Sequence, residues 1–458
     1  MTRMQGTPNI ILINCDDLGW GDPGSYGHPR NKTPHLDRMA DEGVRFTDFY
    51  MASPVCSPSR GAMMTGCYPA RIGFHSFEGR WVLFPGQPVG LSSEEVTVAE
   101  LLKDRGYGTK IIGKWHCGDQ PEFLPTRHGF DEYYGIPYSN DMGRQVEHPS
   151  QWPPLPLLRD EEVIEAQPDQ ASITQRYTEE AVRYIRANAR QQKPFFLYFA
   201  HMYVHLPLIV PQRFEKESEN GRYGAAVAAI DWSTGVIMTE LARLGIDENT
   251  LVVFTSDNGS RNDYGESNGA LRGVKGTTWE GGQRVPCIAR WPGTIPAGRV
   301  CGEIATAMDF LPTFAKLAGA TPPSDRIIDG KDILALMTSD GAKSPHQAFF
   351  YHHQGRLEAV RAGDYKLHVR KREEEVLELY NLRDDIGESE NLVDAMPEKV
   401  EEMQRLLAVC RDDIGDDAVG KSGANRRPIG EVSQGRTLTE FDPDYPYFIA
   451  EYDLAERG

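Results

Sequence analysis

The stretch "PNIILINCDD", residues 8–17, joins an apolar run to two carboxylates. Its continuous β-branched run is typical of a strand buried on both faces, and Asp16 and Asp17 follow where that strand should end. Residues 194–201 ("PFFLYFAH") and 249–259 ("NTLVVFTSDNG") repeat the same order. The three segments predict neighbouring strands of one buried sheet.

Amphipathic segments lie between these strands. Apolar residues recur at three- and four-residue spacing in 96–105, 173–190 and 221–244, which predicts helices. Strands that alternate with helices indicate an α/β fold with a large, mostly parallel, mixed sheet and helices on both faces. Ligand sites of such folds form outside the carboxyl ends of the strands. The polar residues expected there are Asp16, Asp17, His201, His205, Asp257 and Asn258.

The pattern changes in the last quarter of the chain. Residues 357–369 and 374–382 are typical of hairpin strands, and an amphipathic helix is expected at about 397–410. We therefore expect an N-terminal domain over residues 1–340 and a smaller α+β subdomain with a short antiparallel sheet over 341–458. The tail after Asp412 is rich in Gly, Pro and charge, and we expect it to wrap the surface.

Composition narrows the classes of function. The 458 residues include 49 basic and 67 acidic side chains, a net charge of −18, and no basic stripe, which excludes a typical nucleic-acid binder. An anion site in so acidic a protein must be locally positive. Seven scattered cysteines indicate free thiols.

The sequence contains no apolar run of about 18 residues and no recognisable signal peptide. We expect a soluble protein without a membrane span. It would be cytoplasmic as given, or periplasmic or secreted if a leader had been removed.

Two strand ends carry four short oxygen-bearing side chains. Asp16 and Asp17 follow one strand, and Asp257 and Asn258 follow another. Hard divalent cations such as Ca²⁺ or Mg²⁺ take such ligands. The alternative is that these residues simply end strands and begin turns.

The pattern Cys-x-Pro-x-Arg occurs twice, at Cys56 to Arg60 and at Cys67 to Arg71. A thiol near the start of a helix, with an arginine four residues on, would have a lowered pKa and be reactive. A cysteine phosphatase would need arginine six residues after the cysteine, and neither copy has one there. The pattern alone leaves open which copy is functional.

Four further cationic or titratable side chains follow predicted strands or lie in a glycine-rich segment. Lys114 and His116, in "GKWHCG", are two residues apart at the end of a predicted strand and should point to the same side. His205 follows another strand, and Lys275 lies in "LRGVKGTTWEGG". Each alone is typical of a surface cation or a satisfied histidine. Together they form the positive cluster that an anion site requires.

These segments resemble the type I, formylglycine-dependent sulfatases of the alkaline-phosphatase superfamily, and most of all the group that contains arylsulfatase A and N-acetylgalactosamine-6-sulfatase. The resemblance spans both predicted domains and implies an alkaline-phosphatase-like fold. It is carried by "NIILINCDDLGWGD", "TPHLDRMADEGVRFTDFY", "CSPSRGAMMTG", "VTVAELLKDRGYGTKIIGKWH", "HGFDEYYGIPYSNDMG", "VVFTSDNG", "LRGVKGTTWEGGQRVP" and "ELYNLRDDIGESENL".

The resemblance distinguishes the two cysteine motifs. The family signature has Thr-Gly nine and ten residues after the cysteine, as Thr65 and Gly66 are after Cys56, whereas other residues stand there after Cys67. It therefore implies that a maturation enzyme oxidises Cys56 to Cα-formylglycine. Cys67 stands where the family usually has a basic residue, and this departure bears on recognition by the maturation enzyme and on a missing cation.

The resemblance also implies a role for each candidate residue. Ca²⁺, with Mg²⁺ as the alternative, would be bound by Asp16, Asp17, Asp257, Asn258 and the residue made from Cys56. Asp257 would accept the proton of the nucleophile, Arg60 and Lys114 would hold the formylglycine, and His116 would take the proton when sulfate leaves.

The remaining candidates would contact substrate. His205, Lys275 and Lys114 would bind sulfate oxygens, and either His205 or Lys275 would protonate the leaving alcohol. Ser139, in "GIPYSND", matches a sulfate-contacting serine.

The implied reaction is hydrolysis of a small-molecule or oligosaccharide sulfate ester to an alcohol and sulfate, with a galactosamine- or galactose-containing glycan favoured. The alternatives are a formylglycine-dependent phosphodiester or phosphonate monoester hydrolase, and a non-catalytic, metal-dependent glycan-binding homologue. The aromatic-containing loops at 73–86 and 147–160 offer stacking faces for sugar rings, or are ordinary loop anchors.

Overall fold

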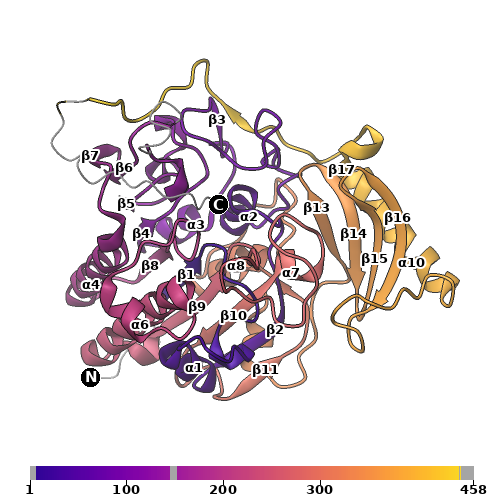
Figure 1. The fold of residues 1–458 in the computed structure, drawn as a ribbon, viewed down its shortest axis with the longest axis horizontal. Helices are drawn as coiled ribbons and strands as arrows, with labels where there is room; N and C mark the ends of the chain where they lie inside the picture. The colour runs from indigo at the N-terminus through magenta and orange to yellow at the C-terminus, as the bar shows by residue number, and fades with distance from the viewer. Residues whose placement is uncertain (1–6, 145–151, 443, 445–458) are drawn as a thin grey trace.

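The computed structural model describes residues 7–144, 152–442 and 444. A large α/β domain and a smaller α+β domain lie side by side (Figure 1). The described strands of the large domain form one eleven-stranded mixed sheet in the order β11-β2-β10-β9-β1-β8-β4-β5-β6-β7, with β12 beside β2. Their bounds are β1 Asn9–Cys15, β2 Val44–Tyr50, β4 Gly108–Gly113, β5 Glu132–Gly135, β6 Pro156–Arg159, β7 Glu162–Ala166, β8 Phe195–Ala200, β9 Thr250–Ser256, β10 Arg284–Arg290, β11 Arg299–Cys301 and β12 Ala305–Thr306.

The three strands predicted from their apolar runs form the centre of this sheet. β1 pairs in parallel with β8 on one side and with β9 on the other. Cys15 lies opposite Ser256, so the residues that follow β1 and β9 leave the sheet together. The antiparallel pairs involve β10 and the strands beyond β5, which confirms the prediction of a mostly parallel, mixed sheet.

Helices cover both faces of the sheet. The alternation of side chains along β1 sends Ile10 and Leu12 into one core and Ile11 and Ile13 into the other. The first core includes α2 (Cys56–Thr65), α3 (Val98–Lys103) and α8 (Phe310–Leu317), and the second includes α1 (Pro34–Asp41), α4 (Ile173–Gln191) and α6 (Gly221–Leu244). The shorter helices are α5 (Gln212–Glu217), α7 (Glu280–Gln283) and α9 (Leu334–Thr338).

Helix α6 is long and apolar enough to cross a membrane by length and composition alone. However, 72% of its apolar window is buried inside the molecule, where it belongs to the core between the sheet and α4. Its apolar character is therefore that of a core helix.

The smaller domain is an antiparallel sheet with one helix. Strands β13 (Phe349–His353), β14 (Arg356–Ala362), β15 (Tyr365–Lys371) and β16 (Glu374–Asn381) pair in chain order. Helix α10 (Pro397–Asp413) shares the core of this sheet. The predicted hairpin strands and helix are confirmed, and α10 runs three residues further than expected.

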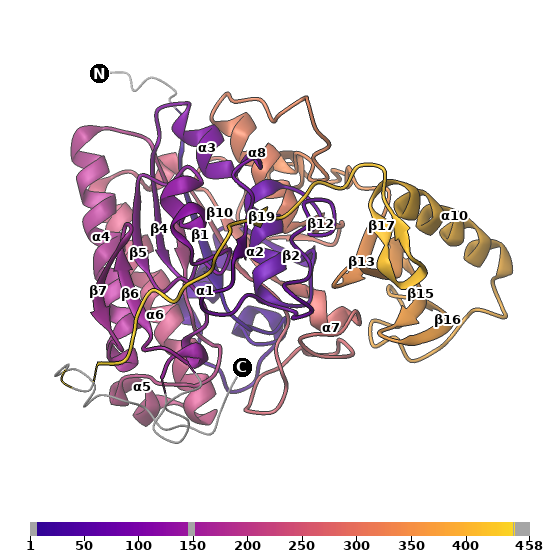
Figure 2. The same cartoon turned by 90° about the horizontal axis from the view of Figure 1, so that it is seen from above.

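The segment after α10 returns to the large domain. It forms a short hairpin of β17 (Gly415–Asp416) and β18 (Lys421–Ser422), and then β19 (Gly430–Glu431) pairs with β3 (Val89–Gly90). Figure 2 shows this yellow segment running from the small domain across the large one. The segment after α10 therefore connects the two domains, in addition to the packing between them.

The second Cys-x-Pro-x-Arg motif lies at this junction. The Arg71 side chain is 1% exposed, and its Nε donates to Asp329 Oδ2 at 2.7 Å. Its two terminal nitrogens each donate to one carboxylate oxygen of Asp413, the last residue of α10, at 3.0 and 2.6 Å. Arg71 therefore connects the segment after α2 with the helix of the small domain.

Replacing Arg71 with methionine should lower the free energy of unfolding by about 2 kcal/mol, because two carboxylates lose a buried cation while remaining partly hydrated. Urea denaturation measures this change. The matched control is Arg405→Met, whose exposed pair with Glu401 should contribute less than about 0.5 kcal/mol. Equal effects of the two substitutions would contradict the structural role of Arg71.

Candidate active site

Helix α2 carries Cys56 as its first residue at the carboxyl edge of the sheet. The helix begins at Cys56 itself, and all ten of its residues are buried. Burial raises the pKa of the Cys56 thiol to about 11, although Lys114 acts in the opposite direction. The prediction of a lowered thiol pKa is wrong, because desolvation of the buried sulfur outweighs the nearby positive charges.

Arg60, one helical turn after Cys56, is fully buried and joins three parts of the site. Its Nε donates to Asp257 Oδ2 at 2.9 Å, and a terminal nitrogen lies 3.1 Å from Asp16 Oδ2. Its other terminal nitrogen donates to the carbonyl oxygen of Lys114 at 2.7 Å. One guanidinium thus holds the residues that follow β1, β4 and β9.

The two predicted pairs of oxygen-bearing side chains come together as expected from the register of β1 and β9. One ligand atom from each of Asp16, Cys56 and Asp257 lies within 4.8 Å of the others. Asn258 Nδ2 donates to Asp17 Oδ1 at 2.7 Å. Asp16 Oδ1 and Asn258 Oδ1 are buried without a hydrogen-bond partner. Buried oxygen atoms rarely lack partners, so this cluster has the composition and the free oxygens of a hard-cation site.

The carboxylates of Asp16 and Asp257 differ in how readily they bind a proton. Burial, together with the neighbouring Asp16 carboxylate, raises the pKa of Asp257 to about 7. Burial also acts to raise the pKa of Asp16, but Lys114 and other cations hold it well below its ordinary value. Among close carboxylates in a buried site, the one with fewer cationic contacts retains a proton most readily.

Two lysines and a histidine contact the carboxylates of the cluster. Lys114 Nζ donates to Ser139 Oγ at 2.9 Å and forms an ion pair with Asp16. Lys275 Nζ donates to Asp17 Oδ2 at 2.9 Å. His205 Nε2 lies 3.3 Å from Ser139 Oγ and 3.9 Å from Asp17 Oδ2. The locally positive cluster that the acidic composition requires is therefore present.

Strand alternation does not explain how Lys114 and His116 are placed. β4 ends at Gly113, so both residues lie beyond the strand, and His116 adopts a positive φ of 61°. Both side chains are nevertheless buried at the site. The expectation that they project from a strand is corrected, because the chain turns at Gly113, where an added Cβ would meet the carbonyl oxygen of Ala200 at 1.7 Å.

Backbone carbonyls fix the tautomers of the two site histidines. His116 Nε2 lies 2.9 Å from Leu83 O, and His205 Nδ1 lies 2.5 Å from Leu206 O. A carbonyl oxygen only accepts, so these nitrogens carry the protons. Burial lowers the pKa of both imidazoles, with Lys114 adding to the effect at His116 and Lys275 at His205. His116 Nδ1, which has no other partner, and His205 Nε2 are left as acceptors.

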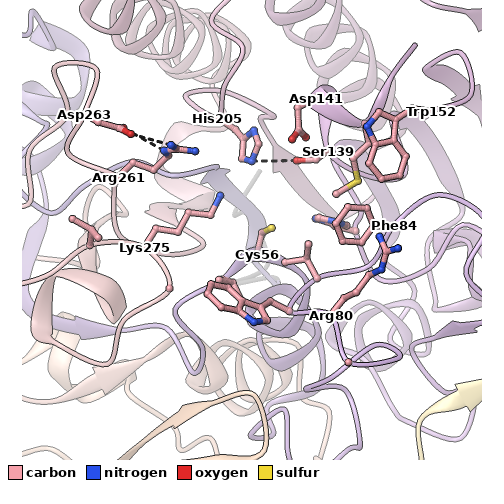
Figure 3. Close-up of a pocket in the computed structure, with 18 residues that line it drawn as sticks. Cys56, Arg80, Phe84, Ser139, Asp141, Trp152, His205, Arg261, Asp263 and Lys275 are labelled. Atoms are coloured by element: carbon pink, nitrogen blue, oxygen red, sulfur yellow. Dashed lines mark hydrogen bonds and ion pairs between the residues drawn. The ribbon is translucent and has the colours of Figure 1, made fainter. Parts of the chain in front are cut away.

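A cavity of about 770 Å³ opens above this cluster (Figure 3). Cys56 lies at its floor, with His116, Ser139, His205 and Lys275 around it. The remaining predicted residues lie beneath the lining: Asp16, Asp17, Arg60, Lys114, Asp257 and Asn258. The structure therefore brings all eleven predicted site residues into one constellation.

Two other residues considered from the sequence lie elsewhere. His201 follows β8, but its ring packs 4.3 Å from that of Phe199 and does not line the cavity. Cys67 is buried beyond the other end of α2, where Arg427 from the returning segment lies 3.3 Å from its sulfur. A guanidinium thus stands beside the position where a basic residue was expected.

Sequence reasoning missed several residues that line the outer cavity, namely Arg80, Asp141, Arg261 and Asp263. Trp81, Phe84 and Trp152 belong to the two aromatic loops, and they also line it. Residues 147–151 of the second loop lie outside the described residues.

The segment that carries Lys275 is held by the smaller domain, which the sequence did not indicate. Lys366 on β15 is fully buried and donates from Nζ to Thr278 O at 2.8 Å. The same nitrogen pairs with Glu280 at 2.9 Å and with Glu388 at 3.0 Å. Glu388 also accepts from the Glu280 amide at 2.8 Å. Nothing in the local pattern around Lys366 distinguishes it from a surface lysine.

Two protein-family models match the chain. The family described as Sulfatase matches residues 8–320, and a family described as N-sulphoglucosamine sulphohydrolase, C-terminal, matches residues 275–412. The chain belongs to the sulfatase family. This sulfatase therefore hydrolyses sulfate esters, and its alkaline-phosphatase-like fold is confirmed.

Two curated relatives and one solved structure show the extent of the similarity. The sulfatase is 44% identical to N-acetylgalactosamine-6-sulfatase from Canis lupus familiaris over 374 residues, which is 79% of this chain and 71% of that protein. It is 43% identical to arylsulfatase A from Homo sapiens, covering 79% and 74% of the two chains. Ps i-CgsB in complex with k-i-k-neocarrahexaose superposes with a TM-score of 0.79 at 31% identity, covering 88% and 92%.

Replacing Lys366 with methionine should free the segment that carries Lys275, because two buried carboxylates lose their shared cation. We expect about 3 kcal/mol of destabilisation, faster amide hydrogen exchange over 272–280, and about a tenfold loss of aryl sulfate turnover. The control is Lys399→Met on α10, where the pair with Glu402 is local to the helix surface. Unchanged exchange over 272–280 in the Lys366 variant would contradict the role.

Proposed function

We propose that this sulfatase hydrolyses sulfate esters of a carbohydrate with a formylglycine made from Cys56 and a bound Ca²⁺. The observation that carries the proposal is the position of Cys56, at the cavity floor between a cluster of carboxylates and a cluster of cations. The formylglycine requires a maturation enzyme as a partner of the chain.

The residues present fit a divalent cation. Asp16, Asp17, Asp257, Asn258 and the residue made from Cys56 would hold Ca²⁺, with Mg²⁺ as the alternative. The unpartnered Oδ1 atoms of Asp16 and Asn258 are the free oxygens that such an ion needs. When bound, the cation offsets the charge of sulfate oxygens and lowers the pKa of a neighbouring hydroxyl.

Position 56 requires more than a thiol, because an ordinary serine or cysteine ester of sulfate would itself hydrolyse slowly. A hydrated aldehyde would supply two hydroxyls on one carbon, one to attack sulfur and the other to expel sulfate as the carbonyl forms again. Arg60 and Lys114 position this residue through the contacts they make beneath it. Asp257, with its raised pKa, is suited to accept the proton of the attacking hydroxyl.

The fixed tautomers assign the remaining proton transfers. His116 Nδ1 is a free acceptor and takes the proton of the second hydroxyl when sulfate is expelled. Burial acts to lower the pKa of Lys275, but the nearby carboxylates of Asp17 and Asp16 help to raise it above its ordinary value, so Lys275 carries a proton that it can share with the leaving oxygen. His205 Nε2 is an acceptor, and with Ser139 it positions substrate; we therefore assign donation to the leaving alcohol to Lys275.

The substrate class rests on the cavity and on the relatives. The cavity offers aromatic faces from Trp81 and Trp152 above the charged floor, and such faces suit sugar rings. The relatives include an N-acetylgalactosamine-6-sulfatase, which favours a galactosamine- or galactose-containing glycan. A panel of defined sulfated saccharides with the sulfate at different ring positions would identify the substrate.

The nearest alternative is a phosphodiester or phosphonate monoester hydrolase. Turnover of 4-nitrophenyl sulfate should exceed that of 4-nitrophenyl phenylphosphonate, and the reverse preference would support the alternative. A non-catalytic glycan-binding homologue would turn over neither compound, but every candidate catalytic residue is present at the site.

Substitution of Cys56 by alanine or serine should abolish turnover, whereas Cys67→Ala should retain most of it, because Cys67 lies outside the cavity. Peptide mass spectrometry of the chain without substitutions should show a loss of about 18 Da at Cys56, the change expected when a thiol becomes this aldehyde nucleophile. Loss of activity in the Cys67 variant alone would refute the assignment.

Removal of divalent cations by chelation should reduce turnover about 100-fold and lower the melting temperature, since a cation bound only by the folded state stabilises it. Added Ca²⁺ should restore both properties. A stripped enzyme that kept its full rate and melting temperature would refute the metal assignment.

A further inference from the structure

We propose that the outer part of the cavity is a second binding subsite, in which Arg80 recognises an anionic group on the sugar ring next to the sulfated one. The proposal rests on the proposed function, since it concerns the same substrate. It adds a requirement that the reaction itself does not impose, namely a second negative charge on the substrate.

The cavity is larger than the reacting group needs. Its volume of about 770 Å³ is towards the upper end of the roughly 300–1,000 Å³ typical of sites that enclose a whole ligand. The reactive floor around Cys56 occupies one part of the lining in Figure 3, and Arg80, Phe84 and Trp152 lie along another side. The remaining volume can accommodate a ring beyond the one that carries the sulfate.

Aromatic side chains form the wall of this outer part. The rings of Phe84 and Trp152 stack with centroids 5.3 Å apart and an interplanar angle of 19°. Trp81 is 39% exposed, and Arg372 of the smaller domain lies over its ring at 5.0 Å. Rigid aromatic faces at a cavity mouth bind the apolar faces of sugar rings at a low entropic cost.

Arg80 supplies a positive charge to this aromatic wall of the cavity. Its guanidinium carbon lies 4.3 Å from the centroid of the Phe84 ring, and the residue is exposed. No carboxylate among the described residues pairs with it. Across the cavity, Arg261 differs because it forms a 2.9 Å ion pair with Asp263.

A guanidinium held over a ring has less freedom to lose when it binds an anion, and it can bind a planar or tetrahedral anion through two parallel hydrogen bonds. Arg38, Arg127 and Arg183 are also exposed, and each pairs with a glutamate. Arg80 is instead left available at the cavity. A substrate that brings its own carboxylate or sulfate ester completes the pairing. We therefore assign to the subsite a ring bearing one of these two groups.

Titration calorimetry with the full-length Cys56→Ala chain, which should not turn over substrate, tests the proposal. The probes are a disaccharide of 6-sulfated N-acetylgalactosamine and a uronic acid, the same disaccharide with its carboxyl group reduced to an alcohol, and one whose second ring carries a sulfate ester. At least one of the two anionic disaccharides should bind about 10-fold more tightly than the reduced one. Comparison of the two identifies the anion.

The second step combines the probes with two substitutions in the same background. Arg80→Gln should remove the preference for the anionic disaccharides. Arg213→Gln is the matched control, because Arg213 also lies on aromatic rings, 4.6 Å from those of Phe214 and Trp232, but does not line the cavity. It should leave the preference intact, and unchanged melting temperatures verify that both variants fold.

Two outcomes would overturn the subsite. One is the absence of any preference for the anionic disaccharides, and the other is a preference that survives Arg80→Gln. Failure of the proposed function is distinguishable, because it would appear as no turnover of 4-nitrophenyl sulfate by the chain with Cys56 intact, whatever the disaccharides do.

Discussion

The buried guanidinium of Arg60 is the interaction on which the site depends. It forms ion pairs with Asp16 and Asp257 and donates to the backbone after β4, and all of these groups are withdrawn from solvent. Carboxylates this close in a low-dielectric interior repel each other strongly, so they remain together only with compensating positive charge. Because Arg60 lies on the helix that begins with Cys56, the same contacts also fix where Cys56 stands relative to the strands.

A second buried network gives the smaller domain a part in the site. Lys366, Glu280 and Glu388 are each buried, and each has a charged partner within about 3 Å. A buried pair costs desolvation energy and is weak evidence for added stability, but it specifies geometry strongly, since either charge alone would be unsatisfied. The network sits where the two domains meet and ends on the segment that carries Lys275. Docking of the small sheet and placement of that lysine are therefore coupled through these contacts.

Much of the fold and the floor of the site could be predicted from the sequence, because both follow from local patterns. The apolar runs of β1, β8 and β9 end in polar residues, and parallel pairing brings those ends together whatever the loops do. The helix predicted at 221–244 has the observed bounds for the same reason, since its apolar spacing is uninterrupted.

The parts that could not be predicted depend on contacts between distant segments. His116 reaches the site through a turn after Gly113, and the two-residue alternation of side chains along a strand does not predict such a turn. The lowered pKa expected for the Cys56 thiol was wrong because its burial depends on all the segments that pack around α2. Lys366 and Arg80 have sequence surroundings typical of surface cations, and only the folded chain shows that one is enclosed and the other faces a cavity.

The complete burial of α2 has a consequence for how the protein is made. An enzyme that binds the backbone around Cys56 has more access to it before α2 packs into the core than afterwards, because Cys56 is the one residue of α2 that lines the cavity. Under the proposed function, maturation and folding therefore compete in time for the same segment. A host that folds the chain quickly while supplying little of the maturation enzyme would accumulate protein that is correctly folded and permanently inactive.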